Sequence, residues 1–329
     1  MDDIRWFAPN RYCTLPVPRL RAAGLTIALE GNQPARLAVA SDGQRAVMAY
    51  EYSRRHRCPL LFYLWDLPPW RLGTGKPDVV FELGGRVRRI PRLVGRYTER
   101  GGYYSRLRFI AERAVAVWCP SANTVQDVRA RFGIDAERVP FCYDSDRFNA
   151  ASGERSAASG DRILSISRLV PHKNHAVILR AAARLDPRPI IHLIGQGEEA
   201  GNLRRLATEL GLWLELGDGW ATDEDVVTAY RAARVVVAPS RFEGFGLTPM
   251  EGLAMGVPVI ASDIPPHREF VNGAVRFFPA DDEVALAREI AAAAPVLPSS
   301  RPPVLEDLTI EACASRFLPR LERLLGRTA

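Results

Sequence analysis

The clearest chemistry in the sequence lies in two cations five residues apart, Arg168 and Lys173. They stand in the loop SRLVPHKNH, between a short apolar run and an expected helix, so both charges and the positive end of the helix dipole would act on one anion. Only two of the 44 basic residues are lysines, and lysine differs from arginine where a compact point charge is needed, as at a phosphate oxygen. The loop is therefore predicted to bind a diphosphate.

A pair of carboxylates eight residues apart, Glu243 and Glu251, flanks the glycine-rich turn in FEGFGLTPMEGL. Amides in such a turn before a helix bind anions, but two acids beside a phosphate site cannot serve the phosphate. They suit sugar hydroxyls, because a carboxylate accepts charge-assisted hydrogen bonds. A third loop, LIGQGEE, contains Gly195 and Gly197, where missing side chains would let a phosphate or a base approach the backbone. The three loops together predict an anion site with acids placed for a sugar.

Apolar runs alternate with amphipathic segments through the C-terminal half, which predicts a parallel, doubly wound sheet. Each of the three loops then follows a strand, and ligands of such sheets bind beyond the carboxyl ends of the strands. The expected strands are 163–167, 190–194, 213–216, 235–239 and 257–261, and the expected helices are 176–185, 198–210, 222–233 with Thr222 as cap, 250–255 and 283–294.

The N-terminal half repeats this alternation more faintly, so two α/β domains are expected. Its expected strands are 4–8, 25–29, 37–40, 60–64, 79–81 and 114–118. The polar segment 149–161, rich in Ala, Ser and Gly, is typical of a linker. We therefore expect an N-terminal domain over residues 1–155, a C-terminal domain over 156–305, and a final helix within 306–329 that packs back on the N-terminal domain.

At these motifs the sequence resembles the retaining glycosyltransferases of family 4, whose GT-B fold faces two Rossmann-like domains across a cleft. SRLVPHKNH is similar to the family's Arg-Leu…Lys loop, LIGQGEE to its Gly-x-Gly turn, and FEGFGLTPMEGLAMGVPVIASD to its pair of glutamates. The order and the spacing of the three motifs also agree. The similarity covers residues 160–280, and PFCYDSDRF, with Asp144 and Phe148, resembles the family's interdomain segment.

The resemblance implies a role for each matched residue. Arg168 and Lys173 would hold the donor diphosphate and stabilise it as a leaving group, and Glu243 would contact the transferred sugar, so these three are the implied catalytic residues. Glu251 would bind the ribose hydroxyls. No metal or other cofactor is implied, because the two cations and a helix dipole do the electrostatic work. The implied donor-binding residues are Gly195, Gly197, Gly217, Trp220, Phe245, Gly246, Leu247, Thr248 and Glu251.

The N-terminal half departs from the family's pattern. Many members carry a glycine-rich loop after the first strand and a His-Asp pair after a later one, whereas this chain has residues 10–16 without glycine and the pair Trp65-Asp66. Trp65 and Asp66 are therefore expected to contact the sugar or the acceptor, with Tyr63, Trp65 and Trp70 as candidate stacking platforms. A core position for Trp65 remains an alternative.

Positive charge is concentrated in residues 1–157, with 25 basic against 16 acidic side chains, a net of +9. Nine of the arginines lie between Arg86 and Arg113. This stretch is typical of a solvated helical face, or of contact with an anionic membrane or acceptor. No aromatic platform or recognition-helix pattern favours nucleic acid.

The first 25 residues lack the basic start and apolar run of a secretory signal, and no apolar stretch is long enough to span a membrane. The five cysteines are scattered, without a CxxC pair or histidines at metal-ligand spacing. We expect reduced cysteines and a cytoplasmic protein, with peripheral contact at the inner membrane surface as an option.

The sequence thus predicts a retaining, metal-independent hexosyltransferase of bacterial glycan biosynthesis that uses a GDP- or UDP-sugar and a glycan, lipid-linked or small-molecule acceptor. A nucleotide-sugar-binding relative without transfer and a sugar-nucleotide epimerase remain alternatives, because a fold does not fix a function. A nicotinamide dehydrogenase is disfavoured, because Ala200 occupies the third glycine position of a GxGxxG pattern that would start at Gly195.

Overall fold

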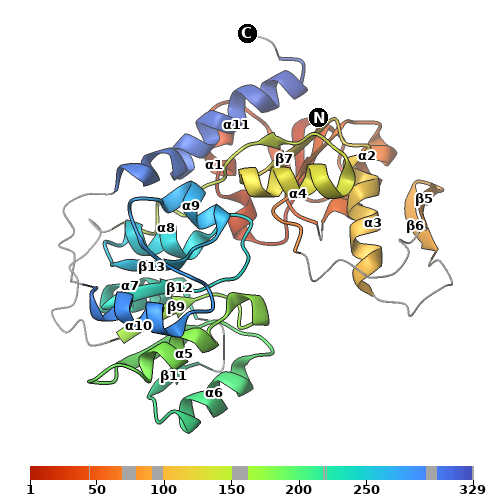
Figure 1. Cartoon of the computed structure of the whole chain (residues 1–329). Helices are drawn as coiled ribbons and strands as arrows, with labels where there is room; N and C mark the ends of the chain where they lie inside the picture. Colours follow the sequence, from red (N-terminus) through yellow and green to blue (C-terminus); the bar gives the residue numbers. More distant parts are fainter. Residues whose placement is uncertain are drawn as a thin grey trace. The chain divides into compact units, whose positions relative to one another are not determined.

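The computed structural model describes residues 1–43, 45–68, 79–90, 99–149, 162–217, 219, 221–293 and 302–327. The chain divides into two compact units, one formed by Met1–Cys142 together with Ile310–Ala329 and the other by Tyr143–Thr309. Each unit contains a six-stranded sheet whose strands all pair in parallel, flanked by helices (Figure 1). The prediction of two doubly wound α/β domains is confirmed.

The sheet of the first unit consists of β1 (Asp2–Phe7), β2 (Ile27–Leu29), β3 (Ala35–Ala40), β4 (Leu60–Tyr63), β7 (Ala116–Cys119) and β8 (Glu137–Arg138). Its strand order is β2-β1-β3-β4-β7-β8. The direction of this order reverses between β1 and β3. In open α/β sheets the loops that follow two such strands border the ligand crevice, so this point is called the topological switch point.

Helices flank this sheet: η1 (Arg11–Thr14), α1 (Val17–Ala22), α2 (Ala46–His56), α3 (Glu99–Ala111), α4 (Ala122–Phe132) and α11 (Ile310–Leu324). Neighbouring side chains of a strand point to opposite faces, and β4 uses both of its faces. Phe62 joins the core that contains residues of α2, α3 and α4. Tyr63 points the other way, where its ring and that of Trp118 pack against Phe317 of α11 at centroid distances of 5.8 and 5.3 Å.

An antiparallel hairpin of β5 (Val79–Leu83) and β6 (Arg86–Ile90) lies outside the parallel sheet. Its turn is Gly84-Gly85, with φ angles of 59° and 73°. A two-residue turn between twisted strands favours positive φ at both positions, which glycine adopts without strain. The interpretation of residues 86–113 as one helical face is therefore wrong, because 86–90 form a strand and α3 begins at Glu99; residues 91–98 lie outside the described part of the chain.

The sheet of the second unit consists of β9 (Arg162–Ile166), β10 (Ile190–Ile194), β11 (Leu214–Leu216), β12 (Val235–Ala238), β13 (Val259–Ser262) and β14 (Arg276–Phe278). Its order, β11-β10-β9-β12-β13-β14, is that of dinucleotide-binding α/β domains, with the switch point between β9 and β12. The short strands β8 and β14 were not predicted, and the remaining strands of both parallel sheets overlap the predicted ones.

The helices of the second unit are η4 (Pro171–Lys173), α5 (Ala176–Ala182), α6 (Ala200–Glu209), α7 (Asp223–Ala232), α8 (Leu247–Ala254), α9 (Pro265–Val271), α10 (Glu283–Ala291) and η5 (Pro303–Leu308). Side chains of α5, α6 and α10 share one core cluster with β9, β10 and β12. The start of α7 is the predicted one: Thr222 accepts from the amide of Asp225, whose carboxylate accepts from the amide of Thr222 in return. This reciprocal capping box satisfies two amides that the first turn cannot pair.

No helix in the ranges given above is long and apolar enough to cross a membrane. The five cysteines, Cys13, Cys58, Cys119, Cys142 and Cys313, are all free and buried. No cluster of three or more potential metal-ligating side chains occurs among the residues that the structure describes.

Candidate functional site

The loops that follow β9 and β12 meet at the switch point of the second unit. Lys173, from the first loop, places Nζ 2.5 Å from Oε1 of Glu243, from the second. Ser240 donates from Oγ to the same carboxylate oxygen at 2.7 Å. Thr248, at the start of α8, donates from Oγ1 to the carbonyl of Ile166 at 2.7 Å, which ties this helix to the end of β9. Two predicted catalytic residues, 70 positions apart in the chain, are therefore in direct contact.

The positive charge of Lys173 lowers the pKa of Glu243. Burial alone would raise the pKa of this carboxyl, but the positive charge of Lys173 and the hydrogen bonds from Lys173 and Ser240 bring its pKa below the ordinary value. Glu243 is therefore ionised at neutral pH, and it balances the charge of Lys173. Arg168 is exposed on the same loop and has no ion pair with any described residue. Among the described residues, therefore, no acid balances the charge of Arg168.

Glu251 lies on α8 with only 5% of its surface exposed. Tyr230, fully buried on α7, donates from Oη to Oε2 of Glu251 at 2.9 Å. Burial raises the pKa of Glu251 to about 7, against the lowering effect of the Tyr230 hydrogen bond and of Arg147, while the negative charge of Asp144 adds to the rise. The carboxyl group is therefore divided between its neutral and charged forms at neutral pH.

The segment that contains Asp144 and Phe148, which resembles the family's interdomain segment, packs against Tyr230. The ring of Phe148 meets that of Tyr230 edge to face, with centroids 5.5 Å apart. Arg147 is ion-paired with Asp144 at 3.4 Å and also with Asp223 at the start of α7. These contacts join the segment to the helix that supports Glu251.

Gly195 and Gly197 have a packing role in the structure. A Cβ on Gly195 would lie 1.9 Å from the carbonyl oxygen of Ser167, and one on Gly197 would lie 2.2 Å from that of Leu169. The amide of Leu169 in turn donates to the carbonyl of Gln196 at 2.8 Å. The space that a side chain would need at each glycine is thus taken by the backbone of the Arg168 loop, so close packing of the two loops already requires glycine at both positions.

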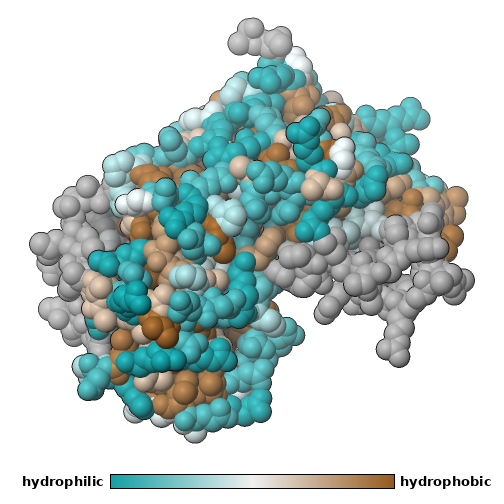
Figure 2. All heavy atoms as spheres, in the orientation of Figure 1, coloured by the Kyte–Doolittle hydropathy of each residue, from teal (hydrophilic) through white to brown (hydrophobic). Residues whose placement is uncertain are grey.

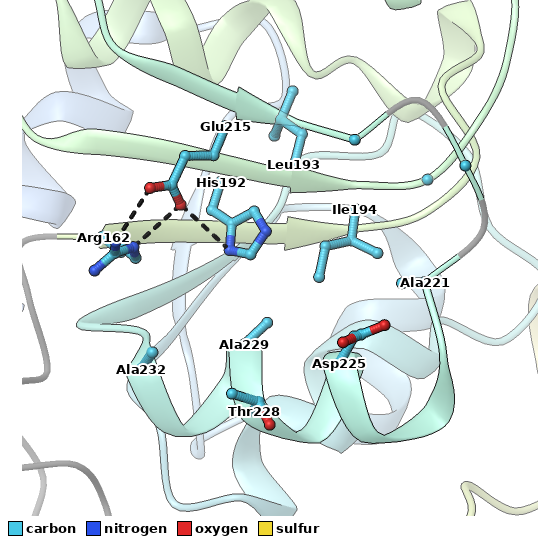
Figure 3. Close-up of a pocket in the computed structure, with 13 residues that line it drawn as sticks. Arg162, His192, Leu193, Ile194, Glu215, Ala221, Asp225, Thr228, Ala229 and Ala232 are labelled. Carbon is cyan, nitrogen blue, oxygen red and sulfur yellow. Dashed lines mark hydrogen bonds and ion pairs between the residues drawn. The ribbon is translucent and has the colours of Figure 1, made fainter.

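A cavity of about 610 Å³ borders this glycine turn, between α7 and the strands β9, β10 and β11. Gly195 and Gly217 line it at the carboxyl ends of the strands. Figure 3 shows Glu215 held by Arg162 and facing His192 at one end of the cavity, with α7 across from the strands. Lys173, Glu243 and Glu251 are not among the residues that line this cavity. Trp220, expected beside it, lies outside the described residues.

The first turn of α8 offers backbone donors. Gly246 is its N-cap and provides no side-chain hydrogen bond, so the amides of Leu247 and Thr248 have no cap to satisfy them and contribute the positive end of the helix dipole. The side chain of Phe245 is buried and packs edge to face on Phe270 at 4.7 Å. Phe245 can therefore present only its backbone to a ligand.

The predicted acceptor residues follow β4 in the first unit. Trp65 is half-buried; its Nε1 donates to the carbonyl of Ser41 at 2.6 Å, and its ring meets that of Phe141 at 4.8 Å. Because Ser41 follows β3, this contact places Trp65 at the switch point of the first unit, next to the half-buried Asp66.

The candidate stacking platform Tyr63 is enclosed within the first unit. It is 1% exposed and donates from Oη to the carbonyl of Val139 at 2.7 Å. The prediction of Tyr63 as a platform is wrong, because neither its ring nor its hydroxyl is available to a ligand. Trp70, the third candidate, lies outside the described residues.

The sequence did not single out Tyr230 or Ser240 for the site. Tyr230 is the only aromatic residue of the expected helix 222–233, which is a weak signal, because one aromatic residue in a helix is more often part of the core. Ser240 stands three residues before Glu243, with nothing in its type or spacing to distinguish it. Their roles follow only from the distances in the folded chain.

Comparison with known proteins adds to this geometry. Residues 149–294 match the family model described as glycosyl transferases group 1. The O-antigen chain mannosyltransferase RfbU of Salmonella typhimurium is 30% identical over 184 residues, which cover 54% of this chain and 50% of the relative. The D-inositol 3-phosphate glycosyltransferase of Nocardia farcinica is 35% identical over 166 residues, or 44% of this chain and 37% of the relative. The matches thus span half or less of the length of these curated relatives.

Solved structures share the fold over nearly the whole chain. Anabaena Alr3699/HepE in complex with UDP and glucose superposes with a TM-score of 0.74 at 15% identity, covering 98% of this chain and 100% of the other. Sucrose-phosphate synthase (tll1590) from Thermosynechococcus elongatus has a TM-score of 0.75 at 17% identity and covers both chains completely. At these identities the likeness establishes the fold, which is GT-B. Within this fold, residues 149–294 are similar to the family of glycosyl transferases group 1.

Proposed function

We propose that this protein transfers a hexose-type sugar from a GDP- or UDP-sugar to a glycan, lipid-linked or small-molecule acceptor, with retention of anomeric configuration and without a metal ion. The observation that carries the proposal is the contact of Lys173 with Glu243 at the switch point between β9 and β12. A phosphate-binding cation and a sugar-binding acid belong side by side where a sugar is joined to a diphosphate. The names of the relatives support a hexose donor, since one is a mannosyltransferase and one solved structure holds UDP and glucose.

In this proposal the donor replaces the contact between Lys173 and Glu243. The diphosphate binds Nζ of Lys173, with Arg168 as the second cation and the amides of Leu247 and Thr248 as further donors. Glu243, released from Lys173, accepts a hydrogen bond from a hydroxyl of the transferred sugar. Glu251 accepts from the ribose hydroxyls, and the base lies toward Gly217.

The reaction then breaks the bond between the anomeric carbon and the phosphate oxygen. The two cations stabilise the negative charge that develops on the leaving diphosphate, which is the work that a metal does elsewhere. The acceptor oxygen bonds to the anomeric carbon on the face that the diphosphate leaves, and the hydroxyl proton passes to the departing phosphate oxygen. This same-face attack retains the anomeric configuration. Trp65 and Asp66 are the proposed acceptor or sugar contacts of the first unit.

Thermal stabilisation by a panel of UDP, GDP, ADP, TDP and NAD tests the donor site. A ligand that binds only the folded state raises its stability in proportion to the logarithm of ligand concentration over Kd. We expect one nucleoside diphosphate to stabilise the protein, and Lys173→Ala and Glu251→Ala to abolish this effect, with Arg180→Ala, exposed on α5, as the control. Stabilisation by NAD alone, or by nothing in the panel, would overturn the proposal.

Product analysis separates the remaining alternatives. Incubation with the matching nucleotide sugar and candidate acceptors, in the presence of a chelator, should yield a product whose anomeric configuration by NMR equals that of the donor. Donor binding without transfer to any acceptor would identify a binding-only relative. Interconversion of the nucleotide sugar itself would identify an epimerase, and a requirement for a divalent ion would refute the metal-independent mechanism.

A further inference from the structure

The hairpin of β5 and β6 has one face packed on the first unit and one face that points away from it. Antiparallel pairing joins Phe81 to Arg88 and Leu83 to Arg86, so each of these pairs shares one side of the hairpin. Ile90 lies on the same side, because it is two residues from Arg88 along β6. We call this side, made of Phe81, Leu83, Arg86, Arg88 and Ile90, the outer face.

The other side of the hairpin is anchored. Glu82 accepts from Oη of Tyr50 at 2.7 Å and is ion-paired with Arg54 at 3.0 Å, both on α2. The amide of Val87 donates to the carboxylate of Glu51 at 2.8 Å, also on α2. Val80 and Val87 pack against the core of the unit. The inner side is therefore bound to α2, which leaves the outer face directed to solvent.

The outer face combines exposed apolar and basic side chains. Leu83 is 65% exposed and Ile90 is 55% exposed, and both rank among the large hydrophobic residues that the fold leaves in water. Arg86 and Arg88 are exposed as well, and neither forms an ion pair within the part of the chain that the structure describes. Figure 2 shows hydrophobic residues at the place where Figure 1 draws β5 and β6. Such a mixture matches a surface that is anionic outside and apolar beneath.

We propose that the outer face docks on an anionic lipid bilayer, with Leu83 and Ile90 entering the apolar side of the interface and Arg86 and Arg88 contacting lipid phosphates. Charge complementarity supports this occupant, because the outer face has two cations and no acid, in a half of the chain with a net charge of +9. Basic residues beside an anionic leaflet and apolar residues placed to enter it add their effects. A protein partner could also bury Leu83 and Ile90, but it would need acidic side chains of its own to pair with the two arginines. The docking does not depend on the activity proposed above.

Vesicle flotation with the full chain tests this surface. The protein should float with phosphatidylcholine vesicles that contain phosphatidylglycerol, remain unbound with phosphatidylcholine alone, and dissociate as salt is raised. Arg86→Gln and Arg88→Gln should each weaken the partition by about fivefold, and Leu83→Ser combined with Ile90→Ser should weaken it by about tenfold or more. The matched controls are Arg180→Gln and Trp213→Ser, one exposed cation and one exposed apolar residue of the second unit, which should partition like the parent.

A depth-sensitive probe distinguishes lipid insertion from binding of a free anion. Because the five native cysteines are buried, Leu83→Cys offers a single exposed thiol for an environment-sensitive fluorophore. Its emission should shift to the blue with anionic vesicles and stay unchanged with soluble glycerol phosphate. Equal partition of all variants, equal binding to neutral vesicles, or a response to glycerol phosphate alone would overturn the proposal. Nucleotide binding, followed in the same variants, should be unchanged, so failure here is separable from failure of the donor site.

Discussion

The hydroxyl of Tyr230 lies 2.9 Å from Oε2 of Glu251 and donates a hydrogen bond to it, with both groups buried. This hydrogen bond favours the charged carboxylate, which burial disfavours. The other charged groups that act on Glu251 are Arg147 and Asp144, with opposite effects. Tyr230 is therefore a positioning residue for the proposed ribose contact and sets the pH at which that contact is available.

Tyr230→Phe should shift the pH dependence of nucleotide binding. In the parent, the affinity for a ribonucleoside diphosphate should rise as pH passes through about 7, because the charged form of Glu251 is the better acceptor of ribose hydroxyls. Loss of the hydrogen bond raises the pKa of Glu251 further, so the midpoint should move up by about one pH unit or more. Titration calorimetry over this range measures it.

A control variant and a control ligand show whether the shift comes from the hydrogen bond between Tyr230 and Glu251. Tyr52→Phe removes a hydroxyl that donates to the carbonyl of Gln33 in the first unit, and it should leave the profile unchanged. A 2′,3′-dideoxy nucleotide should bind the parent and Tyr230→Phe equally. If Tyr230→Phe lowers affinity equally at every pH, the hydroxyl has only a structural role.

Lys173 and Glu243 should be energetically coupled in the ligand-free protein. Their side chains are 14% and 17% exposed, so replacement of one leaves a poorly solvated charge without its partner. Lys173→Ala and Glu243→Ala should each destabilise the protein, and the double variant should be more stable than the sum of the two effects predicts, by about 1–3 kcal/mol. Urea unfolding of the four proteins measures this coupling. Strict additivity would mean that the pair is not formed in solution.

The glycine turn can be tested with two alanine substitutions close in sequence. Gly197→Ala should cost about 3 kcal/mol or more, because its Cβ would lie 2.2 Å from a backbone oxygen that cannot move away cheaply. Gly201→Ala lies in α6, where a Cβ meets nothing within 4 Å, and should stabilise the protein by about 0.5–1 kcal/mol. Thermal unfolding compares them. Equal effects would contradict the close packing of the two loops.

His175 and Glu251 should give the stability of the ligand-free protein opposite dependences on pH. Burial, and then the charges of Lys173 and His172, lower the pKa of His175 to about 3. Between pH 7 and 5 the unfolded chain therefore binds a proton at His175 that the folded chain does not, so acid destabilises by about 1.4 kcal/mol per pH unit below the ordinary pKa. For Glu251 the folded chain binds the extra proton, because its pKa is about 7, so its contribution to stability grows as pH falls over the same range.

Single variants separate the two effects of pH on the free energy of unfolding, which partly cancel in the parent. His175→Gln should make stability less sensitive to acid between pH 7 and 5, and Glu251→Gln should make it more sensitive. Urea unfolding at several pH values in this range provides the slopes. A change of the same sign in both variants would show that at least one of the two shifts is assigned wrongly.

Much of the fold was readable from the sequence because the pattern is regular. Apolar runs such as 235–239 mark strands, loops such as SRLVPHKNH mark the points where strands end, and the capping signal at Thr222 was correct. Strand order was not readable, because the order is set by packing across the sheet. It is the adjacency of β9 and β12 that brings Lys173 to Glu243.

Other features were missed for identifiable reasons. The apolar and basic alternation of Arg86–Ile90 fits a strand, and Gly84-Gly85 is a hairpin signal, but the density of arginines suggested one continuous helix. In the sequence, the aromatic ring of Tyr63 indicates a ligand contact, whereas in the folded chain its hydroxyl donates to the carbonyl of Val139. Gly195 and Gly197 lie on a loop after a strand, as predicted, but their close packing against the backbone of Ser167 and Leu169 depends on the fold and cannot be read from the sequence.

The membership of α11 in the first unit affects the order in which the chain can fold during synthesis. Phe317 closes the face of the sheet that contains Trp118 and Tyr63, yet it comes after the whole of Tyr143–Thr309 in sequence. The second unit is continuous and can assemble as soon as it leaves the ribosome, whereas the first cannot complete the packing around Trp118 and Tyr63 until α11 has been made. The half of the protein that is translated first is thus completed last, the reverse of the usual N-terminal-first order.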